Sequence, residues 1–331
     1  MKVSVIIPCR NEERYISDCI NSLFNNGFDN SLMEIIVIDG QSTDKTLAIL
    51  DKLRKDFPHL KVVLNPDKIT PVALNLGIEH AQGDYIMIAS AHSLFSSGYI
   101  NTLVKNMEEI PDAIAVGGVM KTKVKNETRT SIAIRNILSN KFGVGNAMFR
   151  IGAEVIRKVD TVPFGLYKAH ELKKSGGYDK RLIRNHDIEL SKRLLRNGGS
   201  IYLIPDAHCD YFARETYSSM AENNFRNGKW NILTVFLTKT VKSLSIRHFI
   251  PLLFVLSLAI PVILSILYFP LIFVSILSLS LYILALIFVI GKEDLKDTSF
   301  IHMFWGFFVL HISYGFGSLV GLLMLPKMAI K

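Results

Sequence analysis

The run Ile35-Ile36-Val37-Ile38-Asp39-Gly40-Gln41-Ser42-Thr43-Asp44 decides the fold, because a stretch of apolar residues ends abruptly in an Asp-Gly turn. Such a run is typical of a strand buried on both faces of a parallel sheet. A matching run, Val3 to Ile7, ends at Pro8-Cys9-Arg10-Asn11-Glu12-Glu13. Apolar residues between the two runs recur at helical spacing, from Tyr15 to Phe24. The chain therefore opens with a strand–helix–strand unit.

Both polar loops of this unit, Pro8 to Glu13 and Asp39 to Asp44, follow the carboxyl ends of their strands. Ligands of open α/β sheets bind beyond these ends. The carboxylates of Asp39 and Asp44 suit ribose hydroxyls, a base edge or a metal ion, and Gly40 lets the backbone approach a ligand closely. We therefore expect a binding site at this edge of the sheet.

The following residues alternate between helical and strand patterns, which indicates an α/β fold related to the Rossmann type. The predicted elements are a helix over 46–53, a strand over 61–64, a helix over 71–80, a strand over 85–88, a helix over 99–107, a strand over 113–120, a helix over 188–195 and a strand over 200–204. The polar, basic and then glycine-containing segment 121–145 is predicted to be a loop region.

The end of the chain is predicted to lie in a membrane. Residues 249–290 contain no charge over 42 positions, which is enough for two helical spans of about 20 residues each. We predict helices at about 249–268, 270–290 and 300–325, turning near Tyr268-Phe269-Pro270. His302, Trp305, His311 and several glycines dilute the third segment, which fits either a span or an interfacial helix. The predicted domains are a cytoplasmic domain over 1–235, a basic connector over 236–248 and a membrane domain over 249–331.

Charge supports this arrangement. Residues 249–331 hold four lysines and three acids, so +8 of the formal net charge of +9 lies in residues 1–248. Lys239, Lys242 and Arg247 precede the first predicted span, as expected of a cytoplasmic flank. No signal peptide is expected before Val3. The basic excess fits an anionic lipid surface or a diphosphate ligand, and no nucleic-acid-binding motif accompanies it. The cysteines, Cys9, Cys19 and Cys209, are expected to be reduced bystanders.

Four stretches in this order resemble the inverting glycosyltransferases of family 2, which have a GT-A fold: VSVIIPCRNEE, IIVIDGQSTDKT, FGLYKAHELKKSGGYDKRLIRNHDIEL and NNFRNGKW. The likeness covers about residues 3–230. It is greatest to the membrane-anchored succinoglycan type, which builds bacterial exopolysaccharide repeat units on a polyprenyl diphosphate. It implies a multi-pass protein of the inner, cytoplasmic membrane, with the catalytic domain in the cytoplasm. The implied partners are a nucleotide sugar, a polyprenyl-diphosphate-linked saccharide, membrane lipid and other polysaccharide assembly proteins.

The resemblance also implies roles for matching residues. A UDP-linked sugar would lie against the first two loops, with Pro8, Arg10 and Glu12 along the uridine, Asp39 on the uracil or ribose, and Gly40, Ser42 and Asp44 shaping the loop. The family's Asp-x-Asp motif, which holds the ribose and a Mg²⁺ or Mn²⁺ ion, reads Ser90-Ala91-His92 here. His92 can ligate a metal, but the loss of a carboxylate at Ser90 weakens the expected hold on a hard cation.

The same resemblance makes Asp187 the general base that deprotonates the acceptor hydroxyl, while His186 replaces the family's preceding acid. The family's Gln-x-x-Arg-Trp motif maps to residues 226–230 without its glutamine. Arg226 and Lys229 would meet the diphosphate or acceptor, and Trp230 would stack on a sugar or lie at the membrane surface.

Structural roles remain open for each of these residues. Asp39 and Asp44 suit a turn or a helix cap, Asp187 suits the first turn of a helix, and His92 suits an ordinary loop. Lys229 and Trp230 also suit the flank of a membrane span. Other functions remain open as well. The first is a non-catalytic partner that binds nucleotide sugar or lipid, which the serine at position 90 suggests. The second is a processive polysaccharide synthase, although three spans are few for a pore. The third is a transporter, although the sequence contains no internal repeat.

Overall fold

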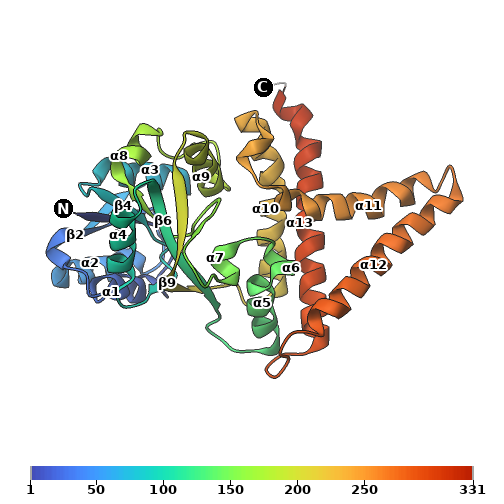
Figure 1. Ribbon diagram of the computed structural model, residues 1–331, viewed down its shortest axis with the longest axis horizontal. Coiled ribbons are helices and arrows are strands. Elements are labelled where there is room, and N and C mark those ends of the chain that lie inside the picture. The colour runs from blue at the N-terminus through green and yellow to red at the C-terminus, as the bar shows by residue number, and fades with distance from the viewer. Residues whose placement is uncertain (1, 330–331) are drawn as a thin grey trace. The chain divides into compact units, whose positions relative to one another are not determined.

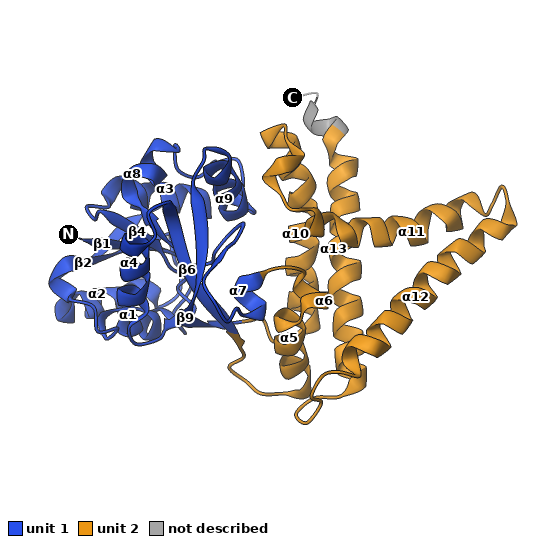
Figure 2. Ribbon diagram, in the orientation of Figure 1, with its two compact units in different colours: residues 1–121, 148–212 blue, residues 122–147, 213–331 orange. Residues whose placement is uncertain are grey.

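The computed structural model describes residues 2–329 and divides into two compact units, coloured separately in Figure 2. Unit 1 consists of residues 1–121 and 148–212, and unit 2 of residues 122–147 and 213–331. The two compact units therefore differ from the predicted domains, whose boundaries are at 235 and 248. Residues 122–147 and 213–235 belong to the unit that holds the apolar helices. The functional division at 235 and 248 stays a prediction.

Unit 1 is built on a mixed sheet. The strands of the described residues are β1 (Val3–Cys9), β2 (Met33–Asp39), β3 (Leu60–Leu64), β4 (Tyr85–Ile88), β5 (Ser93–Phe95), β6 (Ala113–Lys123), β7 (Arg157–Lys158), β8 (Leu166–Lys168) and β9 (Ser200–Phe212). Their order is β3-β2-β1-β4-β8-β6-β9-β5, with β7 beside β9. The pairs β1–β2, β2–β3 and β1–β4 are parallel, whereas β8 pairs antiparallel with both β4 and β6. The predicted α/β fold is confirmed.

Helices cover both faces of this sheet (Figure 1). One face carries α1 (Ile16–Phe24), α2 (Thr46–Asp56) and α4 (Tyr99–Glu109), and the other carries α3 (Thr70–His80), α8 (Ala169–Lys174) and α9 (His186–Arg196). A short helix, α7 (Met148–Ile151), re-enters the unit. Strands buried on both faces explain why β1 and β2 read as unbroken apolar runs. Strand β9 runs eight residues beyond the predicted end at Ile204, to Phe212.

A buried carboxylate clasps the amino ends of the parallel strands. Glu34 is fully buried and accepts hydrogen bonds from Ser4 Oγ at 2.6 Å, the Gln82 N–H at 2.8 Å and Lys61 Nζ at 2.7 Å. Burial raises the pKa of this carboxyl, but the bonds from Lys61, Ser4 and Gln82 together outweigh it and lower the pKa. The charged and polar side chains at the amino ends of the parallel strands thus bond to one another, whereas the loops at the carboxyl ends are the ones that can bind a ligand.

Unit 2 is helical. Its helices are α5 (Arg129–Ser139), α6 (Lys141–Val144), α10 (Tyr217–Thr238), α11 (Ile250–Leu264), α12 (Ile272–Ile290) and α13 (Phe300–Ala329). Figure 1 shows α10 and α13 side by side. The two backbones touch directly, because a Cβ atom on Gly228 would overlap the Tyr314 carbonyl and one on Gly317 would overlap the Phe225 carbonyl. Gly317 and Gly321, two of the glycines that dilute the third apolar segment, are therefore part of its contact face with α10.

The prediction of a loop over 121–145 is wrong, since this segment contains α5 and α6. Thr128 caps α5: its Oγ1 accepts the Ser131 N–H at 3.1 Å, and Ser131 Oγ accepts the Thr128 N–H at 2.9 Å. Ile134 and Ile137 then pack in a cluster with residues of α12 and α13. The sequence analysis missed the cap and the apolar stripe after it because the segment begins with polar residues.

Three helices are long and apolar enough to cross a membrane, judged by length and composition: residues 246–264, 269–290 and 300–325. They agree with the three predicted segments. A short 3-10 turn, Phe269–Leu271, immediately precedes α12, at the place where the turn between the first two segments was predicted. Pro261 lies inside α11.

Replacing Gly228 by alanine should destabilise unit 2, because the added methyl group must push α10 away from the Tyr314 carbonyl. We expect a loss of about 1–3 kcal/mol, typical of overpacking. Thermal unfolding of the full chain in detergent measures it. Ser218→Ala, on the exposed side of the same helix, is the control. An equal melting temperature for both variants would contradict this contact.

Candidate functional site

The loops after β1 and β2 are joined by reciprocal hydrogen bonds at the carboxyl edge of the sheet. The Asn11 N–H donates to Ser42 Oγ at 2.9 Å, and Asn11 Oδ1 accepts the Thr43 N–H at 2.8 Å. The Gly40 N–H donates to the Cys9 carbonyl at 2.8 Å. Asn11 has a positive φ of 56°, a conformation that asparagine tolerates better than most residues. These bonds fix both loops as one rigid rim.

Asp39 lies at the centre of this rim and is fully buried. Its Oδ2 accepts the Ser42 N–H at 3.0 Å, and its Oδ1 accepts the Ser42 hydroxyl at 2.5 Å. This arrangement is the turn role that the sequence left open for Asp39, and Ser42 is its partner. Gly40 is close to Arg10, since a Cβ at position 40 would lie 3.4 Å from both Cβ and Cδ of the exposed arginine.

Asp44 joins the first loop to helix α2. Its Oδ1 accepts the Thr46 N–H at 3.0 Å and the Thr46 hydroxyl at 2.6 Å, and its Oδ2 accepts the Glu13 N–H at 3.1 Å. Burial raises the pKa of the carboxyl, but the bonds from Thr46 and Glu13 together lower it. Both oxygens are thus engaged within the protein, which gives Asp44 a structural function at a helix start.

His92 and Glu12 form a pair across two strands. The imidazole Nδ1 lies 3.1 Å from Glu12 Oε1, and both side chains are partly exposed. An ionised carboxylate only accepts hydrogen bonds, so Nδ1 is the donor in this contact, and in the neutral imidazole Nε2 has a lone pair. Among the described residues, Nε2 has no hydrogen-bond partner. Ser90, the other predicted residue of this motif, is half-buried after β4.

Aromatic rings that the sequence did not single out surround His92. The Tyr211 ring lies 5.1 Å and the Tyr15 ring 6.3 Å from the imidazole, and Phe212 stacks on Tyr15 at 5.8 Å. The guanidinium of Arg150 lies 5.6 Å from the centre of the Tyr211 ring. The unexpected length of β9 brings Tyr211 and Phe212 here, and Arg150 follows the segment that we expected to be a loop. The alternation of apolar and polar residues that continues past Ile204 could have predicted the length of β9.

The residues at this edge of the sheet fit a divalent metal ion only if a bound diphosphate and water supply most of its ligand atoms. The described residues contain no group of three or more His, Cys, Asp or Glu side chains that could hold a metal. A histidine whose Nδ1–H donates to a carboxylate is, however, the usual arrangement of a metal-binding imidazole. Nε2 of His92 would supply one bond, and a diphosphate and water would supply the others. Glu12 is then the residue that orients the imidazole.

Asp187 lies in the first turn of α9, and its side chain is exposed. Its carboxylate is close to Tyr167 of β8: burial raises the pKa of that phenol, and the charge of Asp187 raises it further. Asn185 does not cap α9 with its side chain and has a positive φ of 59°. His186 packs its ring against Tyr178 at 5.6 Å, and burial lowers its pKa, although the charge of Asp187 opposes this shift.

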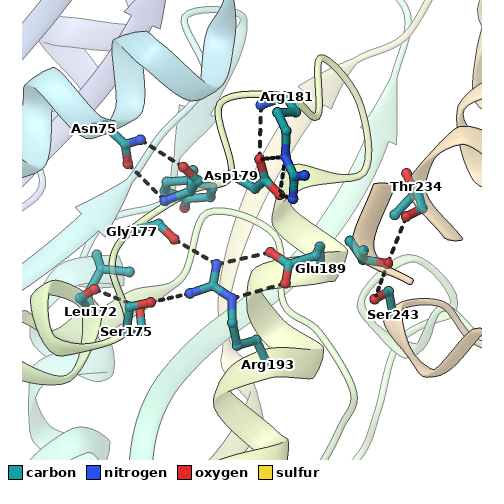
Figure 3. A network of polar contacts seen from close by, with 12 residues as sticks. Asn75, Leu172, Ser175, Gly177, Asp179, Arg181, Glu189, Arg193, Thr234 and Ser243 are labelled. Carbon is teal, nitrogen blue, oxygen red and sulfur yellow. Dashed lines mark hydrogen bonds and ion pairs between the residues drawn. The ribbon is translucent and has the colours of Figure 1, made fainter. Parts of the chain in front are cut away.

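A buried ion pair holds the loop that precedes α9 (Figure 3). Arg193 donates to both oxygens of Glu189, at 3.0 and 2.9 Å, and also to the carbonyls of Ser175 and Gly177. Asn75 of α3 completes this support by pairing with the backbone of Tyr178, with both bonds at 2.8 Å. Glu189 therefore positions the loop before Asp187.

Most of the predicted site residues lie in unit 1, and three of them lie in unit 2. Pro8, Arg10, Glu12, Asp39, Gly40, Ser42, Asp44, Ser90 and His92 all lie at the carboxyl ends of β1, β2 and β4. Asp187 belongs to the same unit through α9. Arg226, Lys229 and Trp230 belong to α10 of unit 2, where Arg226 is exposed and pairs with Glu222, and Lys229 and Trp230 are half-buried.

Residues 4–160 match the family described as glycosyl transferase family 2. The chain thus carries a family 2 glycosyltransferase domain. Its sequence is similar to a glucuronosyltransferase of Methanococcus voltae named dolichyl N-acetyl-alpha-D-glucosaminyl phosphate 3-beta-D-2,3-diacetamido-2,3-dideoxy-beta-D-glucuronosyltransferase, with 29% identity over 71% of this chain and 77% of that protein. It is also similar to the succinoglycan biosynthesis protein ExoA of Rhizobium meliloti, with 27% identity over 63% of each chain. The second similarity thus spans less than two thirds of its relative.

The fold of the glycosyltransferase is similar to that of the mannosyltransferase PcManGT from Pyrobaculum calidifontis, solved in complex with GDP-Man and Mn²⁺. The TM-score is 0.61 at 15% identity, and the match covers 97% of this chain and 87% of the other. This likeness confirms the predicted GT-A type of fold.

Replacing Arg193 by methionine should destabilise the glycosyltransferase, because it leaves a carboxylate of only 6% exposure without its cation. Breaking a buried ion pair costs about 3–5 kcal/mol. The control is Arg181→Met, which breaks the pair of a 60% exposed arginine with Asp179 and should cost about 0–1 kcal/mol. Denaturant unfolding of the two variants measures the difference, and equal losses would contradict a supporting function of Glu189–Arg193.

Proposed function

We propose that this glycosyltransferase moves a sugar, with inversion, from a UDP-linked donor to a hydroxyl of a lipid-linked saccharide during surface polysaccharide synthesis. The observation that carries the proposal is the meeting of buried Asp39 and the Glu12–His92 pair at one strand edge, within a family 2 domain. The names of two relatives, one acting on a dolichyl-linked sugar and one in succinoglycan biosynthesis, support a lipid-linked acceptor.

The donor would bind with its nucleoside along the rim formed by the first two loops. Ser42 already holds both oxygens of Asp39, so the carboxylate is fixed before a ligand arrives. Each oxygen can accept a second bond, from a ribose hydroxyl or from the N–H of a base. Arg10 is exposed beside Gly40 and is free to lie along the nucleoside. The fixed rim reduces the ordering that binding requires.

The transfer needs one base and one stabilised leaving group. Asp187 accepts the proton of the acceptor hydroxyl while that oxygen bonds to the anomeric carbon, and the bond from this carbon to the diphosphate breaks. The electron pair leaves with the nucleoside diphosphate. Nε2 of His92 would hold a divalent ion, which would supply neutralisation of that negative charge. Among the chain's own residues, Arg226 and Lys229 are the proposed partners of the diphosphate or acceptor, and Trp230 of a sugar.

The apolar helices explain why such an enzyme would act at a membrane. Three candidate spans follow the catalytic segments, and a basic connector precedes them. A polyprenyl-linked acceptor is confined to the bilayer surface, so tethering raises its effective concentration. We propose the inner membrane as the location, with the family 2 domain on the cytoplasmic side and other polysaccharide assembly proteins as neighbours.

Asp187→Asn should lower kcat about 10²- to 10⁴-fold with a smaller change in KM, because the amide cannot accept the acceptor proton. Nucleotide release is measured with the full chain in lipid, with UDP-, GDP- and dTDP-sugars and polyprenyl-linked acceptors. Asp206→Asn, an exposed acid on β9, is the control. Normal turnover of Asp187→Asn would exclude it as the base. Donor binding without release under all conditions would indicate a non-catalytic partner.

Glu12→Gln should weaken metal activation about 10- to 100-fold, because the imidazole of His92 loses the carboxylate that orients it. Initial rates are measured against Mn²⁺ and Mg²⁺ concentration, with EDTA as the zero point. Glu13→Gln is the matched control, since Glu13 lies in the same loop but its carboxylate accepts the Lys45 N–H and, among the described residues, does not contact His92. Equal metal dependence in both variants would exclude Glu12 as the residue that orients a metal-binding imidazole.

A further inference from the structure

Helix α10 accompanies α13 over most of its length. Near the start of α13, the Tyr217 hydroxyl donates to the His302 carbonyl at 2.8 Å. Further along, Gly317 meets the Phe225 carbonyl, and a Cβ on Gly321 would lie 2.7 Å from the Lys229 carbonyl. The two helices therefore run beside each other from residue 302 to residue 321 of α13.

Helix α10 is too polar to enter the core of a bilayer. It carries Glu222 and Arg226, whose side chains are 64% and 58% exposed, together with Asn223 and Asn227. It is not among the candidate spans found in the described residues. Charged side chains are rare inside membranes because their desolvation is costly. If α13 crossed the bilayer, α10 would be carried into the hydrocarbon with it.

The two faces of α13 differ in exposure. Ile301, Trp305, Phe316 and Leu323 are 65%, 51%, 50% and 68% exposed, and their spacing of 4, 11 and 7 residues places them on one stripe. The opposite face is buried, with Met303 and Phe307 at 0% and Leu310 at 3%. One exposed apolar stripe, with a tryptophan in it, is typical of a helix lying in the membrane interface.

The hairpin of α11 and α12 leaves α13 on the side away from α10. Gly315 faces α11, because a Cβ there would overlap the Pro251 carbonyl, whereas Gly317 faces α10. Two residues correspond to about 200° around a helix, so the partners lie on opposite sides. Figure 1 shows the same arrangement. The end of the hairpin is apolar and open, with Ile266 85% and Leu267 87% exposed.

We propose that α13 lies along the membrane surface with its apolar stripe in the lipid, and that the α11–α12 hairpin alone enters the bilayer. The loop over 291–299 and the last turns of α13 are then on the same side. Position 327 of α13, a lysine in the sequence, shares that side with Lys239, Lys242 and Arg247, in agreement with the positive-inside rule. This inference concerns unit 2 and does not depend on which sugar is transferred.

A depth profile tests the inference. Ile301→Cys, Ile312→Cys and Leu323→Cys place a nitroxide on the same face of α13, in the full chain reconstituted in lipid vesicles. Collisions with oxygen and with a water-soluble nickel chelate report the depth of each label. A surface helix gives equal depths for the three positions. A spanning helix gives a label at 312 about 15 Å deeper than the labels at 301 and 323, which would overturn the proposal.

The sides of the membrane are tested separately. Asp294→Cys and Lys331→Cys are treated with an impermeant maleimide in sealed vesicles, before and after permeabilisation. The native cysteines are buried, at 5%, 0% and 1% exposure for Cys9, Cys19 and Cys209, so the unchanged chain serves as the background. Both positions should react at the same stage. Reaction of one position before permeabilisation and of the other only after it would show that α13 crosses.

Discussion

Parallel pairing of β1 with β2 in the register that places Cys9 opposite Asp39 is the constraint on which the site depends. It delivers two polar loops to one edge of the sheet at the same height. The loops then bond to each other through Asn11, Ser42 and Thr43 instead of to solvent. Because β4 pairs with β1 on its other side, His92 reaches Glu12. A shift of one residue in this register would separate these groups and turn the strand's side chains to the wrong faces.

The sequence was sufficient for the parts of the fold that repeat a simple pattern. Unbroken apolar runs predicted β1, β2 and β4, and the uncharged stretch after Phe249 predicted the hairpin of α11 and α12. The same patterns placed the loop residues at one edge. They did not show which carboxylate was occupied: both oxygens of Asp44 are used to start α2, whereas the Glu12 carboxylate turned out to orient His92. Thr46 is a local partner of Asp44 that a cap pattern can predict, but the Glu13–Asp44 and His92–Glu12 contacts join loops that are remote in sequence, so no local pattern contains them.

The misjudged segments have a common physical cause. The stretch 121–145 looked like a loop because its apolar residues are few, yet they pack on α12 and α13, which lie more than a hundred positions away in sequence. The glycines of α13 looked like interruptions, yet Gly317 and Gly321 permit contact with α10 and Gly315 permits contact with α11. In both cases the stabilising partner is remote in the chain. Local propensity is a weak guide when tertiary packing supplies most of the stability of a helix.

The direct contact of the α10 and α13 backbones has a consequence for the choice of acceptor. Packed side chains permit small sliding motions between helices, but a carbonyl seated against a glycine leaves nothing to rearrange. Helix α10 is therefore held at one height relative to α13. If α10 binds the acceptor as proposed, it does so at a fixed height relative to α13, so these contacts cannot follow a saccharide that lies higher or lower along α13.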